Sequence, residues 1–379
     1  MNVLGIHLRL LVGPTIPIPA TSDLINSIKS IEIKNADVDK DGFEIVFNVG
    51  RSGVKDLFDY SHQINPLLKP GNRVVIQVMF GVKPTTLIDG IIRHQQLNPS
   101  NNSSQSTLTV TGEDVSVLMD KTEVSEPHPN LPDSAAITTI ISRYITNGIT
   151  PEVVIPPLEE VTPETDRTPI QRGTDLKYLQ SLAARYSHVF YIEPSEMPLF
   201  TTAYWGPPKI LAMAQKPLSF NLGSSTNVDS INFQYDALRP RQIRGYVMDR
   251  VSGIEIPIVA VTSTRPPLSA QPAAIVNQPH TQTRQITPEG GSSALQAQNQ
   301  AQTETEDSVN VVNVTGDLDA LKYGDILRAR TIVELRGVGF SHDGRYYVKS
   351  VTHKIEPGKY KQNFTLTREG LGSTVPMVS

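Results

Sequence analysis

The sequence contains no cysteine among its 379 residues, which excludes disulfide bonds, thiolate metal sites and thiol nucleophiles. It also lacks any run of 18 apolar residues, so it holds no candidate transmembrane helix. Charge of one sign is not in excess, because 34 basic residues stand against 38 acidic ones. We therefore expect packing and association to stabilise the protein, with no membrane insertion and no nucleic-acid binding as its primary role.

Familiar catalytic and metal-binding patterns are missing as well. The sequence has no G-x-S-x-G elbow, P-loop or dinucleotide fingerprint. None of its eight histidines form the helical i, i+4 pair of a zincin, and His94 and His353 fall within predicted strands. The segment DVDKDG at residues 37–42 imitates the start of a calcium loop, but the twelfth position is Asn48 inside a predicted strand. We expect a hairpin turn there, and no catalytic residue, cofactor or metal ion.

Short strands dominate both ends of the chain. At the N-terminus, apolar residues at positions 4, 6, 8 and 10 alternate with their neighbours, which predicts a strand rather than a signal peptide. Residues 30–34 and 43–49 flank an Asp-rich turn and predict a hairpin. Further strands separated by Gly, Pro, Asn and Ser follow to about residue 118, and a similar strand-like pattern resumes after residue 219. Such a series is typical of a barrel or a sandwich.

The middle of the chain shows helical patterns. Residues 135–149 show helical spacing, with Asp133 or Ser134 as the expected N-cap and Gly148 as the expected C-cap. Thr174 is placed to cap a second helix. The apolar stripe of that helix (Leu176, Leu179, Leu182 and Tyr186) is expected to pack on its own sheet, and Trp205 is expected to be a packing anchor.

These patterns predict a mainly β protein with an α+β insert, divided into five parts. They are a first tube-like β-barrel at 1–118, an α+β domain with two helices at 119–218, a second, discontinuous tube-like β-barrel at 219–262 and 307–373, a Pro-, Gln- and Thr-rich excursion at 263–306 that is partly helical, and a tail at 374–379. For the excursion two interpretations stand: a flexible loop, or a segment that orders against a neighbouring subunit.

Three phrases of the first β region recur in the last one, in the same order. LKPG at 68–71 matches LKYG at 321–324, the Asp-Gly pair at 89–90 matches the pair at 343–344, and LTVTG at 108–112 matches LTREG at 366–370. We interpret the echo as a duplicated barrel. The signature positions, expected to be turn and strand residues of the repeat and not a binding site, are Leu68, Gly71, Asp89, Gly90, Leu108, Leu321, Gly324, Asp343, Gly344 and Leu366.

Three longer segments carry a family resemblance. TDLKYLQSLAARYSHVFYIE at 174–193, LKYGDILRAR followed by FSHDGRYYVKSVTHKI, and NFTLTREGLG resemble the phage late control protein D family. Its members are baseplate hub proteins of contractile phage tails, related to the hub part of type VI spike proteins and to hubs of phage-derived injection systems. The resemblance covers most of the chain and is strongest at 174–193 and 316–372.

The resemblance implies a structural, non-enzymatic homotrimer with two tube-type barrels per chain. Such a trimer forms a pseudo-sixfold ring that joins a hexameric inner tube to a trimeric spike, among other baseplate components. It would be assembled in the cytoplasm into a phage tail or tail-like particle. The chain ends at Ser379, so the spike would be a separate protein. Two alternatives remain: a carbohydrate-binding or adhesin-like multidomain β module, and a hydrolase whose site the sequence does not reveal.

Overall fold

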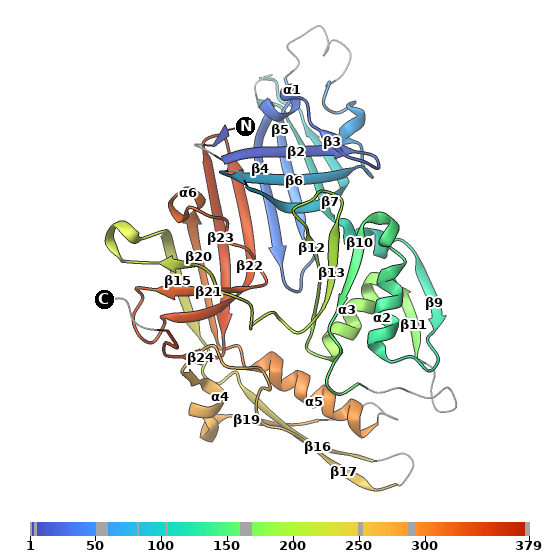
Figure 1. The fold of residues 1–379 in the computed structure, drawn as a ribbon, viewed down its shortest axis with the longest axis vertical. Helices are drawn as coiled ribbons and strands as arrows, with labels where there is room; N and C mark the ends of the chain where they lie inside the picture. Colours follow the sequence, from blue (N-terminus) through green and yellow to red (C-terminus); the bar gives the residue numbers. More distant parts are fainter. Residues whose placement is uncertain are drawn as a thin grey trace.

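The computed structural model describes residues 2–3, 6–50, 60–81, 83–102, 105–159, 169–248, 253–286 and 293–375. It confirms the predicted mainly β fold with an α+β insert (Figure 1). The largest sheet has 14 strands among the described residues and is built from both ends of the chain. None of the helices in those residues is long and apolar enough to cross a membrane.

The first half of the large sheet comes from the N-terminal region. Its strands lie in the order β2-β6-β7-β8-β5-β4, all antiparallel, with β1 (Asn2–Val3) and β3 (Ile18–Pro19) attached to β2. The strands are β2 (Ile6–Gly13), β4 (Ile28–Ala36), β5 (Gly42–Asn48), β6 (Arg73–Phe80), β7 (Lys83–Asn98) and β8 (Thr107–Asp114). Alternating apolar residues fill one core on one side of these strands, and helices α1 (Ser22–Asn26) and η2 (Pro66–Leu68) pack at its end.

The second half repeats this arrangement. Its order is β14-β21-β22-β23-β20-β15, in which each strand takes the place of one strand of the first half. The strands are β14 (Gln215–Ser219), β15 (Val228–Tyr235), β20 (Val312–Asp319), β21 (Ile332–Arg336), β22 (Gly344–Glu356) and β23 (Lys359–Arg368), with α6 (Ala320–Tyr323) after β20. One pair differs, because β14 runs parallel to β21 whereas β2 runs antiparallel to β6.

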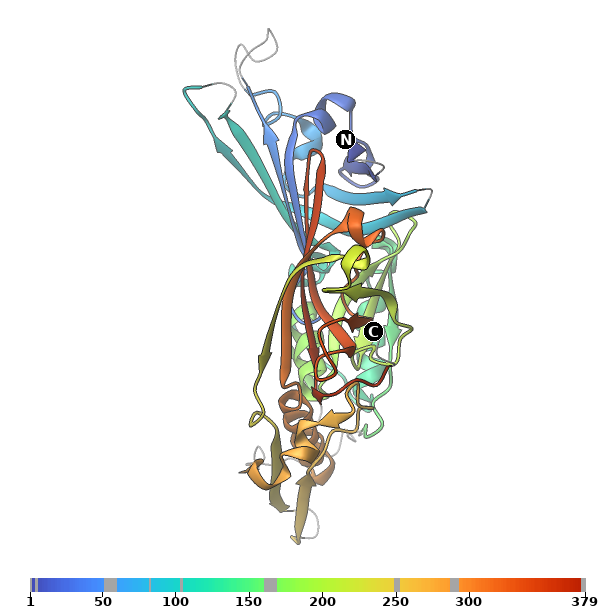
Figure 2. The same cartoon turned by 90° about the vertical axis from the view of Figure 1, so that its left-hand side faces the viewer.

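The two halves meet edge to edge. Strand β4 of the first half pairs antiparallel with β22 of the second, from Ser350↔Ala36 to Ile355↔Ile31. The strands β7-β8-β5-β4-β22-β23-β20-β15 therefore form one uninterrupted run of eight. Figure 2 shows this run along the length of the molecule, with the β7–β8 hairpin projecting at one end.

Irregularities in the ladders fall at matching places in the two halves. The register of β7 on β8 shifts at Arg93, and the register of β22 on β23 shifts at Lys349. The pairs β4–β5 and β15–β20 likewise shift at Lys29 and Asp229. Bulges bend a strand at a defined position, so shared bulges mean that the halves share their curvature as well as their strand order.

The α+β domain lies beside the sheet and matches the prediction in its helices. Its elements are η4 (Val115–Asp120), β9 (Glu123–Pro127), α2 (Asp133–Ser142), η5 (Ile145–Asn147), β10 (Ile149–Val153), β11 (Ile170–Thr174), α3 (Asp175–Arg185), β12 (Val189–Pro194) and β13 (Thr201–Gly206). Helix α2 follows Pro132, Gly148 ends η5 in the left-handed conformation, and the Thr174 hydroxyl caps α3 by accepting from the Lys177 N–H. The stripe on α3 packs into the domain's own core around Trp205, which is fully buried and donates to the Leu179 carbonyl.

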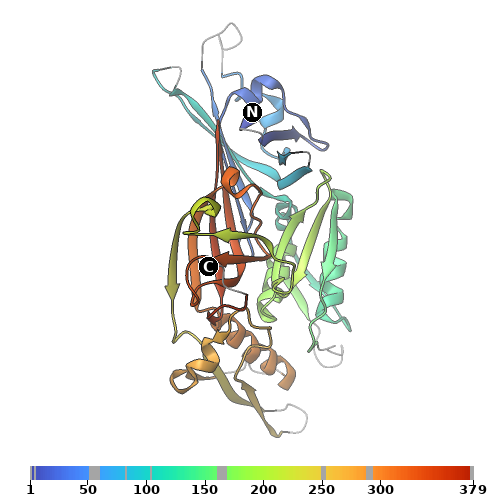
Figure 3. The same ribbon diagram turned by 60° about the vertical axis from the view of Figure 1, so that its left-hand side comes forward.

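A separate lobe contains β16 (Arg241–Met248), β17 (Glu255–Ala260), β19 (Gln282–Gln285) and α5 (Ala294–Ser308) (Figure 3). The predicted division puts β16 and β17 in the second barrel and β19 and most of α5 in the excursion, and the structure corrects it. Strand β16 turns Ile243 and Val247 toward Ala297 and Ala301 of α5. The buried face of this hairpin is thus completed by the helix and not by the core of the large sheet. Short β18 (Gln271–Pro272) and α4 (Ala273–Val276) link the lobe to β24 (Gly370–Leu371).

Candidate functional site

The first candidate surface is the outward face of the eight-strand run. On this face most side chains are hydroxyl, amide or charged groups, with Val46 as an exception, whereas the other face supplies the two cores. Register pairs connect them in rows across the strands, and one row contains His94, Thr111, Glu44, Glu32, Lys354, Lys361 and Asp319. Antiparallel sheets commonly keep one face in water. The mixed charges of this face suit a hydrated surface.

Arg330 connects three parts of the chain. It precedes β21, and its guanidinium donates to the Ala36 carbonyl at 2.7 and 3.0 Å, to the Asp41 carboxylate, and to the Ile192 carbonyl at 3.1 Å. The guanidinium carbon also lies 4.1 Å from the centre of the Tyr191 ring. The side chain is 7% exposed. A single residue of the second half is therefore bonded to the first half and to the α+β domain.

Three carboxyl groups surround this arginine. Asp41 accepts from Arg330, and its backbone N–H donates to the Asp114 carboxylate at 3.1 Å. Burial, together with the nearby Asp41 carboxylate, raises the pKa of Asp114 to about 6. Burial also raises the pKa of Asp37 to about 6, against the opposing effect of Lys349 and Arg330. Asp37 and Asp41 belong to the DVDKDG turn, which the structure shows as the predicted hairpin turn. The described residues contain no group of His, Asp or Glu side chains arranged to hold a metal ion.

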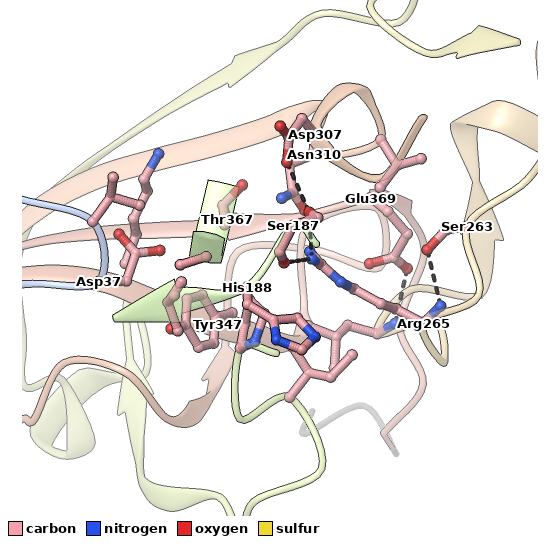
Figure 4. Close-up of a pocket in the computed structure, with 18 of the residues that line it drawn as sticks. Asp37, Ser187, His188, Ser263, Arg265, Asp307, Asn310, Tyr347, Thr367 and Glu369 are labelled. Carbon is pink, nitrogen blue, oxygen red and sulfur yellow. Dashed lines mark hydrogen bonds between the residues drawn. The ribbon is translucent and has the colours of Figure 1, made fainter. Parts of the chain in front are cut away.

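A cavity of about 520 Å³ lies where the large sheet, the α+β domain and the lobe meet. Figure 4 shows that its walls come from all three, with Asp37 and Tyr347 on one side and Arg265 and Glu369 on the other. His188 points into it, and burial lowers the pKa of His188 to about 4, helped by the positive charge of Arg265.

The polar groups of the cavity are used to hold its walls together. Arg265 donates to the Ser187 hydroxyl at 2.7 Å and to its carbonyl at 2.5 Å, and the Ser187 hydroxyl donates to Asp307 at 2.8 Å. Glu369 accepts from the backbone N–H groups of residues 268 and 269. Ser187 belongs to the α+β domain, and Arg265 and Asp307 belong to the segment that contains the lobe. The arrangement fixes three parts of the chain.

The structure places the ten signature residues in turns and strands, some in the first half of the sheet and some in the second. Leu68 and Leu108 are buried in the core of the first half and Leu366 in that of the second, while Leu321 packs against the first core. Gly71 and Gly324 both have positive φ, and Asp343 precedes Gly344 at the start of β22. Asp89-Gly90, which we expected to be a turn, lies within β7, where Asp89 accepts from Arg73 at 2.6 and 2.9 Å.

The phrases that revealed the repeat are not structurally equivalent to one another. Aligning the bulges at Arg93 and Lys349 makes Gly90 the counterpart of Tyr346 instead of Gly344, and Leu108 the counterpart of Gln362 instead of Leu366. For the remaining pair, LKPG and LKYG, backbone hydrogen bonds show which residue of the second half corresponds to Gly71. The Gly71 N–H donates to the Ile92 carbonyl at 2.8 Å, and the Arg330 N–H donates to the equivalent Val348 carbonyl at 2.7 Å.

Gly71 therefore corresponds to Arg330, six residues beyond Gly324. Arg330 has a φ of 66°, so the second half keeps the left-handed turn without the glycine that normally adopts it. Nothing in the sequence singles this arginine out, because its partners lie up to 294 residues away along the chain.

Comparison with solved structures shows that the chain has the fold of phage tail proteins. A tail protein of Neisseria meningitidis matches with a TM-score of 0.63 at 12% identity, over 97% of this chain and 98% of that one. The 43 kDa tail protein of prophage MuSo2 from Shewanella oneidensis matches with a TM-score of 0.66 at 12% identity, over 96% and 98%.

A third structure comes from a secretion machine. An E. coli component of the type VI secretion system, described as structurally similar to bacteriophage T4 tail proteins, matches with a TM-score of 0.53 at 9% identity, over 90% of this chain and 73% of that one. No protein-family model matches the sequence, and no curated protein sequence matches it significantly.

Proposed function

We propose that this protein is the hub of a contractile tail or tail-like injection particle, with a structural and non-enzymatic role. In this proposal three chains form a pseudo-sixfold ring that joins a hexameric inner tube to a separate trimeric spike and contacts other baseplate components. The particle is assembled in the cytoplasm. The names of the proteins that share the fold, which are tail proteins and a type VI component, support a tail role.

The observation that carries the proposal is the internal repeat of the large sheet. Two halves with the same strand order and the same bulges give one chain two similar units, joined side by side. Most soluble homo-oligomers have closed point-group symmetry, and a three-chain ring is one such arrangement. Three chains in a ring present six similar units on one face, which suits a hexameric tube, while the α+β domain and the lobe occur once per chain and suit a threefold partner.

The first test is the mass of the full-length protein in solution. Light scattering after size-exclusion chromatography is expected to give three times the chain mass of 41.6 kDa, and at micromolar concentration the trimer is expected to persist in 0.5 M salt. Obligate interfaces of about 2,000 Å² or more have apolar centres, so salt has little effect on them. A protein that remains monomeric even with its tube and spike proteins contradicts the proposal and favours an independent binding module.

A further inference from the structure

The ladder that joins the two halves within one chain has counterparts of both its strands at the ends of the eight-strand run. Strand β4 pairs with residues 350–355 of β22, beyond the point where β21 leaves that strand. The repeat places a copy of each partner at the ends of the eight-strand run. Strand β15 corresponds to β4, and residues 94–98 of β7 correspond to 350–354 of β22.

Within the described part of the chain, β15 and residues 94–98 of β7 each have a neighbouring strand on one side only. The ladders pair β15 with β20, and they pair residues 94–98 of β7 with β8, because β6 ends opposite Ile91. The Asp236 N–H donates to the Val311 carbonyl. Alternation in an antiparallel ladder then directs the backbone groups of Phe233 and Tyr235 away from β20, toward the open side. Unpaired strand edges are templates for pairing with another chain.

Side-chain burial shows that these edges are incomplete. At the internal join, Ile31, Ile33 and Ile355 are no more than 1% exposed. Their counterparts at the open edge of β15, Ile231 and Phe233, are only half-buried, although they pack against the second core. Leu97 on β7 is half-buried against the first core in the same way. Pairing the two edges covers these apolar side chains.

We propose that residues 94–98 of one chain pair antiparallel with residues 232–236 of a second copy of this chain, a proposal that rests on the trimeric hub proposed above. The internal register Ser350↔Ala36 to Lys354↔Glu32 transfers to His94↔Asp236, Gln96↔Gln234 and Asn98↔Asn232 on the polar face. Leu97 then lies opposite Phe233 on the core face. The interface is head-to-tail, which generates a closed ring when the rotation closes.

The test uses paired cysteines, which the absence of native cysteine makes specific. Gln96→Cys and Gln234→Cys are introduced together into the full-length protein. Both side chains are exposed on the polar face, so neither core is disturbed. Directly opposed residues of an antiparallel pair have Cα atoms about 4.5–5.5 Å apart, which is within the range of a disulfide. Mild oxidation is expected to give mainly covalent trimer on a non-reducing gel, and reduction is expected to return monomer.

Matched controls separate this ladder from other contacts. Gln96→Cys with Asn313→Cys moves one thiol to β20, the next strand in from the edge and opposite Gln234, and is expected to give less than a tenth of the covalent trimer. Lys34→Cys with Thr352→Cys repeats the geometry at the internal join and is expected to close within one chain, which reports the oxidation yield.

The outcomes distinguish the ladder from the hub. A trimer by light scattering that gives no covalent trimer, while the internal pair oxidises fully, overturns the ladder and leaves the hub standing. A chain that is monomeric by light scattering and forms no cross-link overturns both. Equal cross-linking by the Asn313 control shows that the contact is not in this register and also overturns the ladder.

Discussion

At the scale of single residues, the side chain of Arg330 connects parts of the chain that are far apart in sequence. The residue occupies a left-handed backbone position, which costs a residue other than glycine about 1–2 kcal/mol. In return its guanidinium is bonded to Ala36, Asp41 and Ile192. A buried cation with one carboxylate and several carbonyl partners is strongly destabilising to break, because the partners remain buried without it.

The substitution Arg330→Gly tests this role without backbone strain. We expect it to lower the free energy of unfolding by about 3–5 kcal/mol, although glycine suits the positive φ, because Asp41 loses its buried partner. Chemical denaturation followed by circular dichroism measures the change. The exposed pair Lys34–Asp39 is the control, since Lys34→Ala is expected to cost at most about 1 kcal/mol. Equal midpoints for Arg330→Gly and the unmodified protein would show that the guanidinium network contributes no stability.

At the scale of elements, each half of the sheet pairs a glycine with a phenylalanine on the neighbouring strand. Gly112 of β8 lies opposite Phe43 of β5, and Gly316 of β20 lies opposite Phe364 of β23. A Cβ atom at Gly112 would overlap the Ile91 carbonyl oxygen and the Phe43 ring. The ring thus covers a backbone that has no side chain of its own, which keeps the two strands at their spacing.

Replacing Gly112 with alanine is expected to destabilise the first half by about 1–3 kcal/mol, because the added methyl forces the Ile91 backbone or the Phe43 ring to move. The shift in denaturation midpoint measures this effect. Thr111→Ala changes the next residue, whose side chain lies on the polar face, and is expected to change stability by less than about 0.5 kcal/mol. If both variants unfold at the same midpoint, the close packing under Phe43 is unimportant.

The sequence predicted the helices and strands better than it predicted which elements pack together. Alternation and helical spacing report local geometry, and they located the hairpin at the N-terminus, the cap at Thr174 and the helix in the Gln-rich segment. Alternation shows that β16 has one buried face but not which core buries it, so its assignment to the second barrel was wrong. The repeat was deduced from turn phrases that are not equivalent, since Gly and Asp-Gly occur in many turns. Arg330 was missed because its bonds depend on tertiary structure alone.

At the scale of the whole molecule, the eight-strand run has two different faces. One face holds the two cores, and most side chains on the other are hydroxyl, amide or charged groups. In the ring we propose, three runs joined through β15 and β7 enclose a passage lined by the polar face. Side chains on that face, such as Asn363, then lie inside the assembled particle.

Cysteine labelling tests where this face lies. We expect Asn363→Cys in the recombinant protein to react with both a small maleimide and a large polyethylene glycol maleimide. With tube and spike proteins bound, the reaction with the large reagent is expected to slow at least tenfold, because only the passage leads to the site. Thr139→Cys, exposed on α2, is the control that reacts in both states. Unchanged labelling of Asn363→Cys by the large reagent would place the polar face on the outside.

The correspondence between Arg330 and Gly71 has a mechanical consequence. Within one chain, the join between halves is a β ladder fastened by a buried arginine that reaches the preceding β hairpin. In the ring we propose, Gly71 occupies the same position at each join between chains, and it has no side chain to reach across. A ring of three chains would therefore contain three joins held by an arginine and three joins without one, in alternation. Under a pulling or twisting load, such a ring would separate at the three joins between chains, and each fragment would be one intact chain.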